Sequence, residues 1–127
     1  MINGIKPNIK SSTLNEVDKS KLGITYDEGL DRLLEAIQDD YTNWGNYDKD
    51  KKLDLKIKTG RKFTKIIEGT RVWGFVSRVD GVHLGAPIKV GDIMKAASWR
   101  AAAKHSRGSI FDAEMHKSFS WTGPNYL

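Results

Sequence analysis

The sequence of 127 residues contains no cysteine. This absence excludes disulfide bonds, thiol catalysis and zinc sites built on thiolates, and it is compatible with a reducing compartment. No apolar stretch approaches the roughly 20 residues that a membrane-spanning helix needs, and the start, MINGIKPNIK, lacks the apolar core of a signal peptide. We therefore expect a soluble cytoplasmic protein with no membrane partner.

Motifs of catalysis and of cofactor binding are missing as well. The sequence has no G-x-x-x-x-G-K-[ST], no G-x-G-x-x-G, no H-E-x-x-H and no G-x-S-x-G. His83, His105 and His116 are too scattered to specify a metal site, and no nucleophile is paired with a base at a recognisable spacing. We expect a protein that is not an enzyme and that has no catalytic residue, no metal and no cofactor.

Charge of the two signs is divided unevenly along the chain. Residues 1–50 contain six Lys and Arg against ten Asp and Glu, whereas residues 51–127 contain fifteen against six. A basic segment attracts anions such as nucleic acid, nucleotides or phosphate. The split predicts a polar arm and helical anchor over residues 1–50, followed by a basic β-rich ligand-binding domain over residues 51–127.

A helix is predicted over residues 25–45. Thr25 and Glu28 have the spacing of a capping box, and Gly45 is a plausible end. Apolar side chains recur on one helical face, at Leu30, Leu33, Leu34, Ile37 and Tyr41. Two partners for this face stay open: the rest of the same domain, or the same helix of a second copy in a homo-oligomer.

Period-2 alternation and turn residues divide the rest of the chain into short strands. Strands are predicted at 53–58, 61–68, 71–79, 92–95 and 118–122, with a loop at 82–91 and a late helix at 98–107. Gly74, inside the third strand segment, predicts a bulge or a close approach by a ligand or another backbone. The expected fold class is α+β: an N-terminal amphipathic helix, then a small, mostly antiparallel sheet or barrel with one late helix.

The predicted late helix, SWRAAAKHSRG at 98–108, gathers cations. Arg100, Lys104 and Arg107 are spaced i, i+4 and i+7, which places them on one helical face beside Trp99. A solvated face is the ordinary explanation. The neighbouring strands favour an anion-binding face instead, because they contain basic residues interleaved with aromatic residues. Arginine matches phosphate, and aromatic rings stack on bases. These residues include Arg61, Lys62, Lys65, Arg78, Phe63, Trp73 and Phe75.

Three segments resemble a group of small bacteriophage proteins, and the group is similar to the Thoeris anti-defence sponge proteins, type one. They are RVWGFVSRVDG at 71–81, LGAPIKVGDIMKAASWRAAAKHSRGSIFD at 84–112 and WTGPNYL at 121–127. The resemblance covers residues from about 60 to 127. It implies a non-catalytic protein that sequesters cyclic ADP-ribose signals, with a helical anchor that assembles copies and a β-rich domain that holds the nucleotide.

The resemblance also implies roles for individual residues. Phe75 matches the stacking aromatic residue, Arg100, Lys104 and Arg107 match basic positions, and Asp112 matches the acidic end of the late segment. The leading hypothesis is therefore a phage sponge that binds a cyclic ADP-ribose type nucleotide without hydrolysing it. The alternatives are a basic DNA- or RNA-binding accessory protein and an interaction protein that binds no nucleotide. The predicted ligand-binding residues are Phe75, Trp99, Arg100, Lys104, Arg107, Asp112, Arg61 and Arg78.

Overall fold

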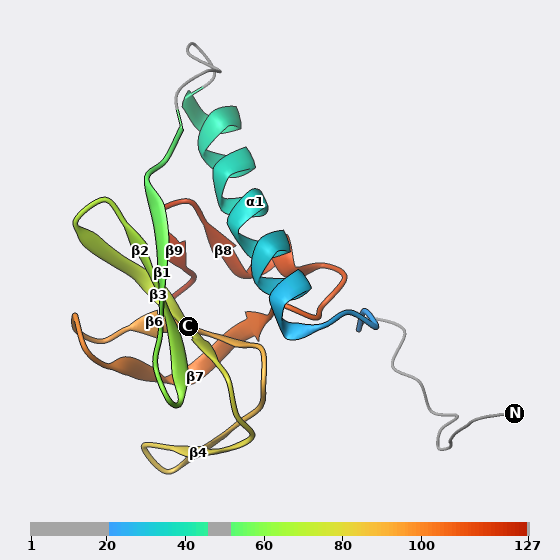
Figure 1. Cartoon of the computed structure of the whole chain (residues 1–127), viewed down its shortest axis with the longest axis vertical. Coiled ribbons are helices and arrows are strands. Elements are labelled where there is room, and N and C mark those ends of the chain that lie inside the picture. The colour runs from blue at the N-terminus through green and yellow to red at the C-terminus, as the bar shows by residue number, and fades with distance from the viewer. Residues whose placement is uncertain (1–20, 46–51, 127) are drawn as a thin grey trace, which may run out of the picture.

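The computed structural model describes residues 21–45 and 52–126 and has one long helix ahead of a five-stranded antiparallel sheet (Figure 1). The helix is α1 (Tyr26–Gly45). The strands of the sheet follow in their spatial order: β1 (Leu55–Thr59), β2 (Phe63–Glu68), β3 (Arg71–Ser77), β6 (Asp92–Ala96) and β7 (Ala102–Ser109). The predicted class, α+β with a small and mostly antiparallel sheet, is confirmed.

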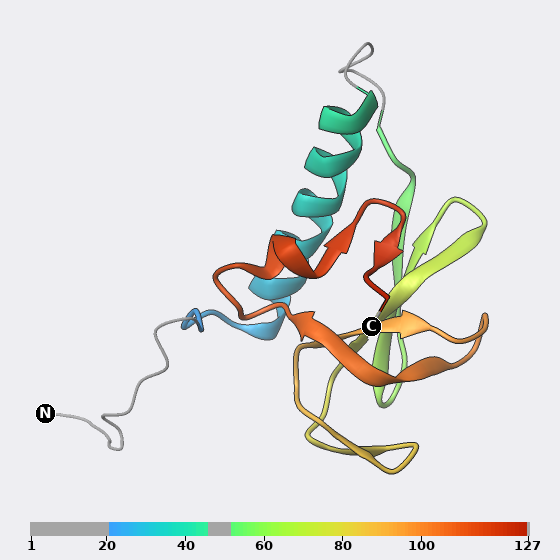
Figure 2. The ribbon, with the colours of Figure 1, turned by 180° about the vertical axis from the view of Figure 1, so that it is seen from behind.

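The remaining elements form two small additions to this sheet. A short hairpin projects from it, and a C-terminal segment lies between α1 and the sheet, as Figure 2 shows from behind. The hairpin consists of β4 (Gly81–His83) and β5 (Ala86–Ile88), within a stretch that the sequence analysis predicted as a loop. The C-terminal segment consists of η1 (Met115–Ser118), β8 (Phe119–Ser120) and β9 (Gly123–Pro124), and β8 covers only part of the strand predicted at 118–122.

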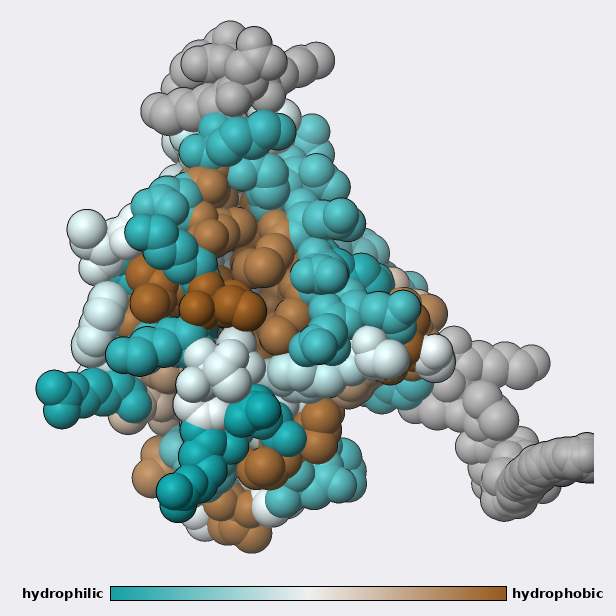
Figure 3. Space-filling view, in the orientation of Figure 1, coloured by the Kyte–Doolittle hydropathy of each residue, from teal (hydrophilic) through white to brown (hydrophobic). Residues whose placement is uncertain are grey.

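The start of α1 has the predicted capping box. The Thr25 backbone N–H donates to Glu28 Oε1 at 2.9 Å, and the Glu28 backbone N–H donates to Thr25 Oγ1 at 3.1 Å. The two residues thereby satisfy each other's backbone donors at the helix start, where no carbonyl of an earlier turn is present. The polar side chains of α1 face outward, and Figure 3 shows hydrophilic residues along that surface.

Replacing Thr25 with alanine is expected to lower the free energy of unfolding by about 1 kcal/mol, because the cap hydrogen bond to the Glu28 N–H is lost. Urea unfolding followed by circular dichroism measures this change. Glu28→Gln is the matched control, since an amide oxygen still accepts from the Thr25 N–H, and its effect should be smaller. No loss in Thr25→Ala would contradict the expected role of the cap hydrogen bond, and an equal loss in both variants would mean that the charge of Glu28 contributes as much as that bond.

The apolar face of α1 packs on the chain's own sheet. Leu30, Leu33 and Ile37 are almost completely buried, in one cluster with Ile66 of β2 and Trp73 of β3. These three side chains are therefore enclosed within the chain itself, whereas Leu34 and Tyr41 of the same face are only partly buried. A homo-oligomer through the 25–45 helix remains a prediction. The predicted domain boundary at 50/51 falls at the edge of residues 46–51, outside the described part of the chain.

The late helix predicted at 98–107 is wrong. Residues 97–100 make a turn, closed by hydrogen bonds from the Ala97 and Ser98 N–H groups to the Ala101 carbonyl, and β7 follows. The run of alanines favours a helix locally, but a segment this short is marginal as a helix in water. Pairing with β6 buries Ala102 against the sheet, and this packing outweighs the local preference.

The other strand predictions at 53–58, 61–68, 71–79 and 92–95 correspond to β1, β2, β3 and β6. Gly74 in β3 has the predicted close approach of another backbone. A Cβ at this position would lie 2.9 Å from the Met94 carbonyl oxygen and 3.0 Å from Cγ of Pro124. No helix within residues 21–45 and 52–126 combines the length and the apolar composition needed to span a membrane.

Candidate functional site

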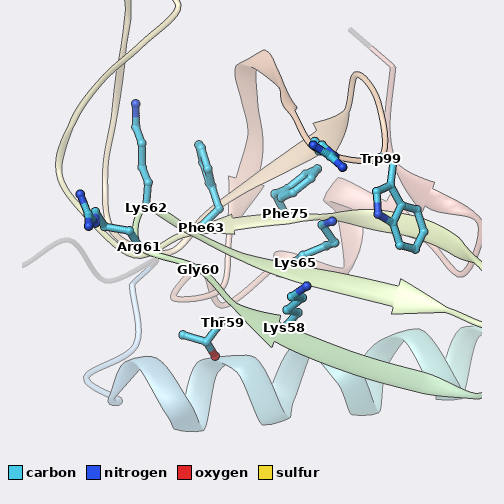
Figure 4. Close-up of a pocket in the computed structure, with 10 residues that line it drawn as sticks. Lys58, Thr59, Gly60, Arg61, Lys62, Phe63, Lys65, Phe75 and Trp99 are labelled. Carbon is cyan, nitrogen blue, oxygen red and sulfur yellow. The ribbon is translucent and has the colours of Figure 1, made fainter.

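A pocket of about 480 Å³ lies on the face of the sheet opposite α1 (Figure 4). Its lining comes from β1, β2, β3, the β1–β2 turn and the β6–β7 turn. Five of the lining residues are cationic (Lys58, Arg61, Lys62, Lys65 and Arg100) and three are aromatic (Phe63, Phe75 and Trp99). Among the described residues that line the pocket, none is acidic.

Strand alternation explains why β2 contributes to both faces of the sheet. Phe63 and Lys65 point into the pocket, whereas Thr64 and Ile66, between and beyond them, are buried on the side of α1. The side chains of Lys58 and Lys65 stand on directly opposed positions of β1 and β2, and Phe75 of β3 is the next residue in the same cross-strand row. The pocket is therefore built by strand register.

Like charges meet at the centre of this row. Lysines directly opposite each other on neighbouring strands destabilise a sheet, and Arg100 adds a third cation to the lining. Desolvation, followed by the charges of Lys58 and then Arg100, lowers the pKa of Lys65 from its ordinary value. The ion pairs found within residues 21–45 and 52–126 all lie elsewhere, at Lys56–Asp54, Arg71–Glu68 and Lys117–Glu114. An anion in the pocket would relieve this repulsion.

The aromatic residues of the pocket differ in how much of each ring is accessible. Trp99, on the β6–β7 turn, is 50 % exposed, and Lys65 Nζ lies 4.6 Å from the centre of its ring. Phe75 is only 3 % exposed, so it forms the floor of the pocket and offers little ring surface for stacking. Phe63 is half-buried and meets Phe75 edge to face, with ring centres 5.9 Å apart. Trp99 and Phe63 are thus the rings available to a planar ligand.

Hydrogen bonds hold the β1–β2 turn at the mouth of the pocket. The Arg78 guanidinium donates from Nη1 to the Gly60 carbonyl at 2.5 Å and to the Arg61 carbonyl at 3.4 Å. Lys62 Nζ donates to the Val82 carbonyl of β4 at 2.8 Å, which ties the turn to the projecting hairpin. Arg78 therefore positions the turn from outside the lining.

Four of the eight predicted ligand residues line this pocket, namely Phe75, Trp99, Arg100 and Arg61. The other four lie outside it. Lys104 is exposed on β7, and Arg107 donates from Nε to the Asn125 carbonyl at 2.9 Å and also to the His105 carbonyl. The Asp112 carboxylate accepts from the Glu114 N–H at 2.9 Å within a turn. Because the 98–107 segment is not a helix, the three cations share no helical face.

Four lining residues with functional side chains are absent from the eight predicted ligand residues: Lys58, Lys62, Phe63 and Lys65. Lys62, Phe63 and Lys65 enter the sequence analysis only as basic and aromatic neighbours of the predicted late helix. The signal that could have found them is the hairpin KIKTGRKFTK, in which a turn at Thr59-Gly60 brings alternating residues of two strands onto one face. Within the part of the chain that the structure describes, no group of three or more His, Cys, Asp or Glu side chains could hold a metal ion.

Comparison with known proteins places the chain in one family. No curated protein and no solved structure matches it. A family model described as "Family of unknown function (DUF7717)" matches residues 9–127, which is most of the chain and includes the whole sheet and the pocket. The chain therefore belongs to this family of unknown function, DUF7717.

Proposed function

We propose that the protein binds and sequesters a nucleotide in the pocket opposite α1. The observation that carries the proposal is the cluster of Lys58, Lys65 and Arg100 beside the exposed ring of Trp99, with no acidic residue in the described lining. Cationic side chains match phosphate oxygens, and an aromatic face stacks on a base. The volume of about 480 Å³ lies in the range of small-molecule sites.

In its most specific form, the ligand is a cyclic ADP-ribose type signal that the protein holds without hydrolysing it, in the cytoplasm of an infected bacterium. The resemblance of residues 60–127 to Thoeris anti-defence sponge proteins supports this form of the proposal. Sequestering a signal present at nanomolar to micromolar levels requires roughly 8–12 kcal/mol of binding free energy. Hydrogen bonds to charged groups contribute about 1.5–3 kcal/mol each, and stacking adds about 1–3 kcal/mol.

The second candidate is a strand of DNA or RNA. The specific observation that favours it is the number of cations, because the five in the lining exceed what the two phosphates of one pyrophosphate need. A strand would then extend beyond the pocket. Binding that neutralises many phosphates weakens steeply with added salt, whereas a nucleotide held by two or three contacts is less sensitive.

A ligand panel with the full chain tests the proposal. We expect cyclic ADP-ribose isomers or other nucleotides to raise the melting temperature at millimolar concentration or below, in a scan that also includes oligonucleotides. Each ligand that raises the melting temperature is then measured again at 50 and 200 mM salt. This comparison separates a nucleotide from a nucleic-acid strand, because only the polyanionic strand should lose most of its stabilising effect. No shift with any nucleotide or oligonucleotide would refute the proposal and favour an interaction protein.

A further inference from the structure

Each of the two accessible rings of the pocket has a lysine ammonium group beside it. At one end, Lys65 Nζ lies 4.6 Å from the centre of the Trp99 ring. At the other end, Lys62 Nζ lies 5.8 Å from the centre of the Phe63 ring. Each pair combines a surface for stacking with a positive charge, and these are the two features that one nucleotide unit requires. Lys62 Nζ also donates to the Val82 carbonyl, whereas Lys65 is the cation nearest to Trp99.

The two rings are separate platforms. Figure 4 shows Phe75 and Lys65 between Phe63 on one side and Trp99 on the other, with Lys65 on the side of Lys58. Phe63 and Lys65 are two residues apart on one face of β2, which separates their Cα atoms by about 7 Å. Phe75, 3 % exposed, forms the floor, and Lys65 Nζ lies 6.0 Å from the centre of its ring. An anion bound by Lys65 would therefore lie over this floor. A base on Trp99 and a second base on Phe63 would flank such an anion.

We propose that the pocket recognises a dinucleotide unit, in which two bases joined by a phosphate stack on Trp99 and Phe63 while Lys65 holds the linking phosphate. This inference rests on the nucleotide binding proposed above, but it replaces the cyclic ADP-ribose form of that proposal, because cyclic ADP-ribose has only one base. A ligand with a single base fills one platform and leaves the other empty. The same unit is present in a linear single strand and in a cyclic dinucleotide, and both present two bases joined through phosphate.

Calorimetric titration of the full chain with three defined ligands tests this assignment. They are the linear 5′-phosphorylated diadenylate pApA, cyclic di-AMP, and ADP, which carries a charge similar to that of pApA but only one base. We expect pApA or cyclic di-AMP to bind about 5- to 150-fold more tightly than ADP, which is the gain from one additional stacked base. A preference for pApA indicates a nucleic-acid strand as the source, and a preference for cyclic di-AMP indicates a free signal.

Variants locate the second base. Trp99→Ala and Phe63→Leu should each reduce the ratio of the affinity for the dinucleotides to the affinity for ADP. Phe63→Leu retains apolar bulk against Phe75, so the sheet should stay folded. Trp44→Ala removes a tryptophan that lies outside the pocket at the far end of α1, where it contacts Trp121, and should leave the preference for dinucleotides over ADP unchanged. If ADP binds as tightly as both dinucleotides, the two-base assignment fails while nucleotide binding stands. If none of the three binds and no other nucleotide does, the proposed function fails with it.

Discussion

Replacing both Lys65 and Arg100 with glutamate is expected to lower nucleotide affinity by at least about a hundredfold. Both residues line the pocket, and Lys65 stands between the two accessible rings. Each substitution removes a charge-assisted contact of about 1.5–3 kcal/mol, and each adds a negative charge that repels phosphate. Two such losses amount to about 3 kcal/mol or more, which corresponds to at least a hundredfold in affinity. This loss of affinity is measured by calorimetric titration with the nucleotide that raises the melting temperature most.

The matched control is the double variant Lys104→Glu with Arg107→Glu. Both double variants lower the net charge from +5 to +1, so that any effect of overall charge is the same in the two proteins. Lys104 is exposed on β7, and Arg107 is bonded to the main chain near the C-terminus. We expect this control to lose less than fivefold in affinity. An equal loss in both proteins would show that the general field of the basic surface, and not the pocket, binds the ligand.

The Lys65 and Arg100 variant should remain folded. Lys58 and Lys65 are directly opposed across β1 and β2, so a glutamate at position 65 converts a repulsive cross-strand pair into an attractive one. The melting temperature without ligand is therefore expected to stay level or rise slightly. A melting temperature that does not fall would separate loss of binding from loss of fold. A rise would also support the view that the opposed lysines contribute to the pocket and destabilise the sheet.

The helix α1 could be predicted from the sequence because its determinants are local. The capping box joins residues three apart, and the apolar stripe repeats over several turns before any tertiary contact is considered. The helix predicted at 98–107 is wrong for the opposite reason. Its alanines favour a helix, but its conformation is decided by the ladder with β6 and by the burial of Ala102, neither of which is visible locally.

The candidate site could be predicted only in part, for the same reason. Trp99 and Arg100 were predicted as ligand residues from the supposed helix at 98–107, with the resemblance adding support for Arg100 and pointing to Phe75. These residues line the pocket although the helix is absent. The pairing of Lys58 with Lys65 depends on strand register. A shift of one residue would turn these side chains to the other face. Conversely, Arg107 was selected from a helical spacing that the structure does not contain, and its guanidinium is occupied by main-chain carbonyls.

Replacing Leu33 with alanine is expected to lower the free energy of unfolding by about 3–5 kcal/mol. Leu33 is completely buried within the cluster that joins α1 to the sheet, so truncation removes apolar contacts and leaves a cavity. For a domain of this size the melting temperature should fall by about 12 °C or more. Leu84→Ala is the control, because the same atoms are removed from a side chain that is 64 % exposed on the β4–β5 hairpin.

The same variant separates the two partners that the sequence pattern left open for this helical face. If Leu33 packs within its own chain, the loss of stability is independent of protein concentration, and sedimentation gives the same mass for both proteins. If the face met a second copy instead, Leu33→Ala would lower the mass of the assembly, and the melting temperature of the unmodified chain would rise with concentration. The complete burial of Leu33 and Ile37 within one chain predicts the first result, because a side chain already enclosed has no surface left to offer a partner.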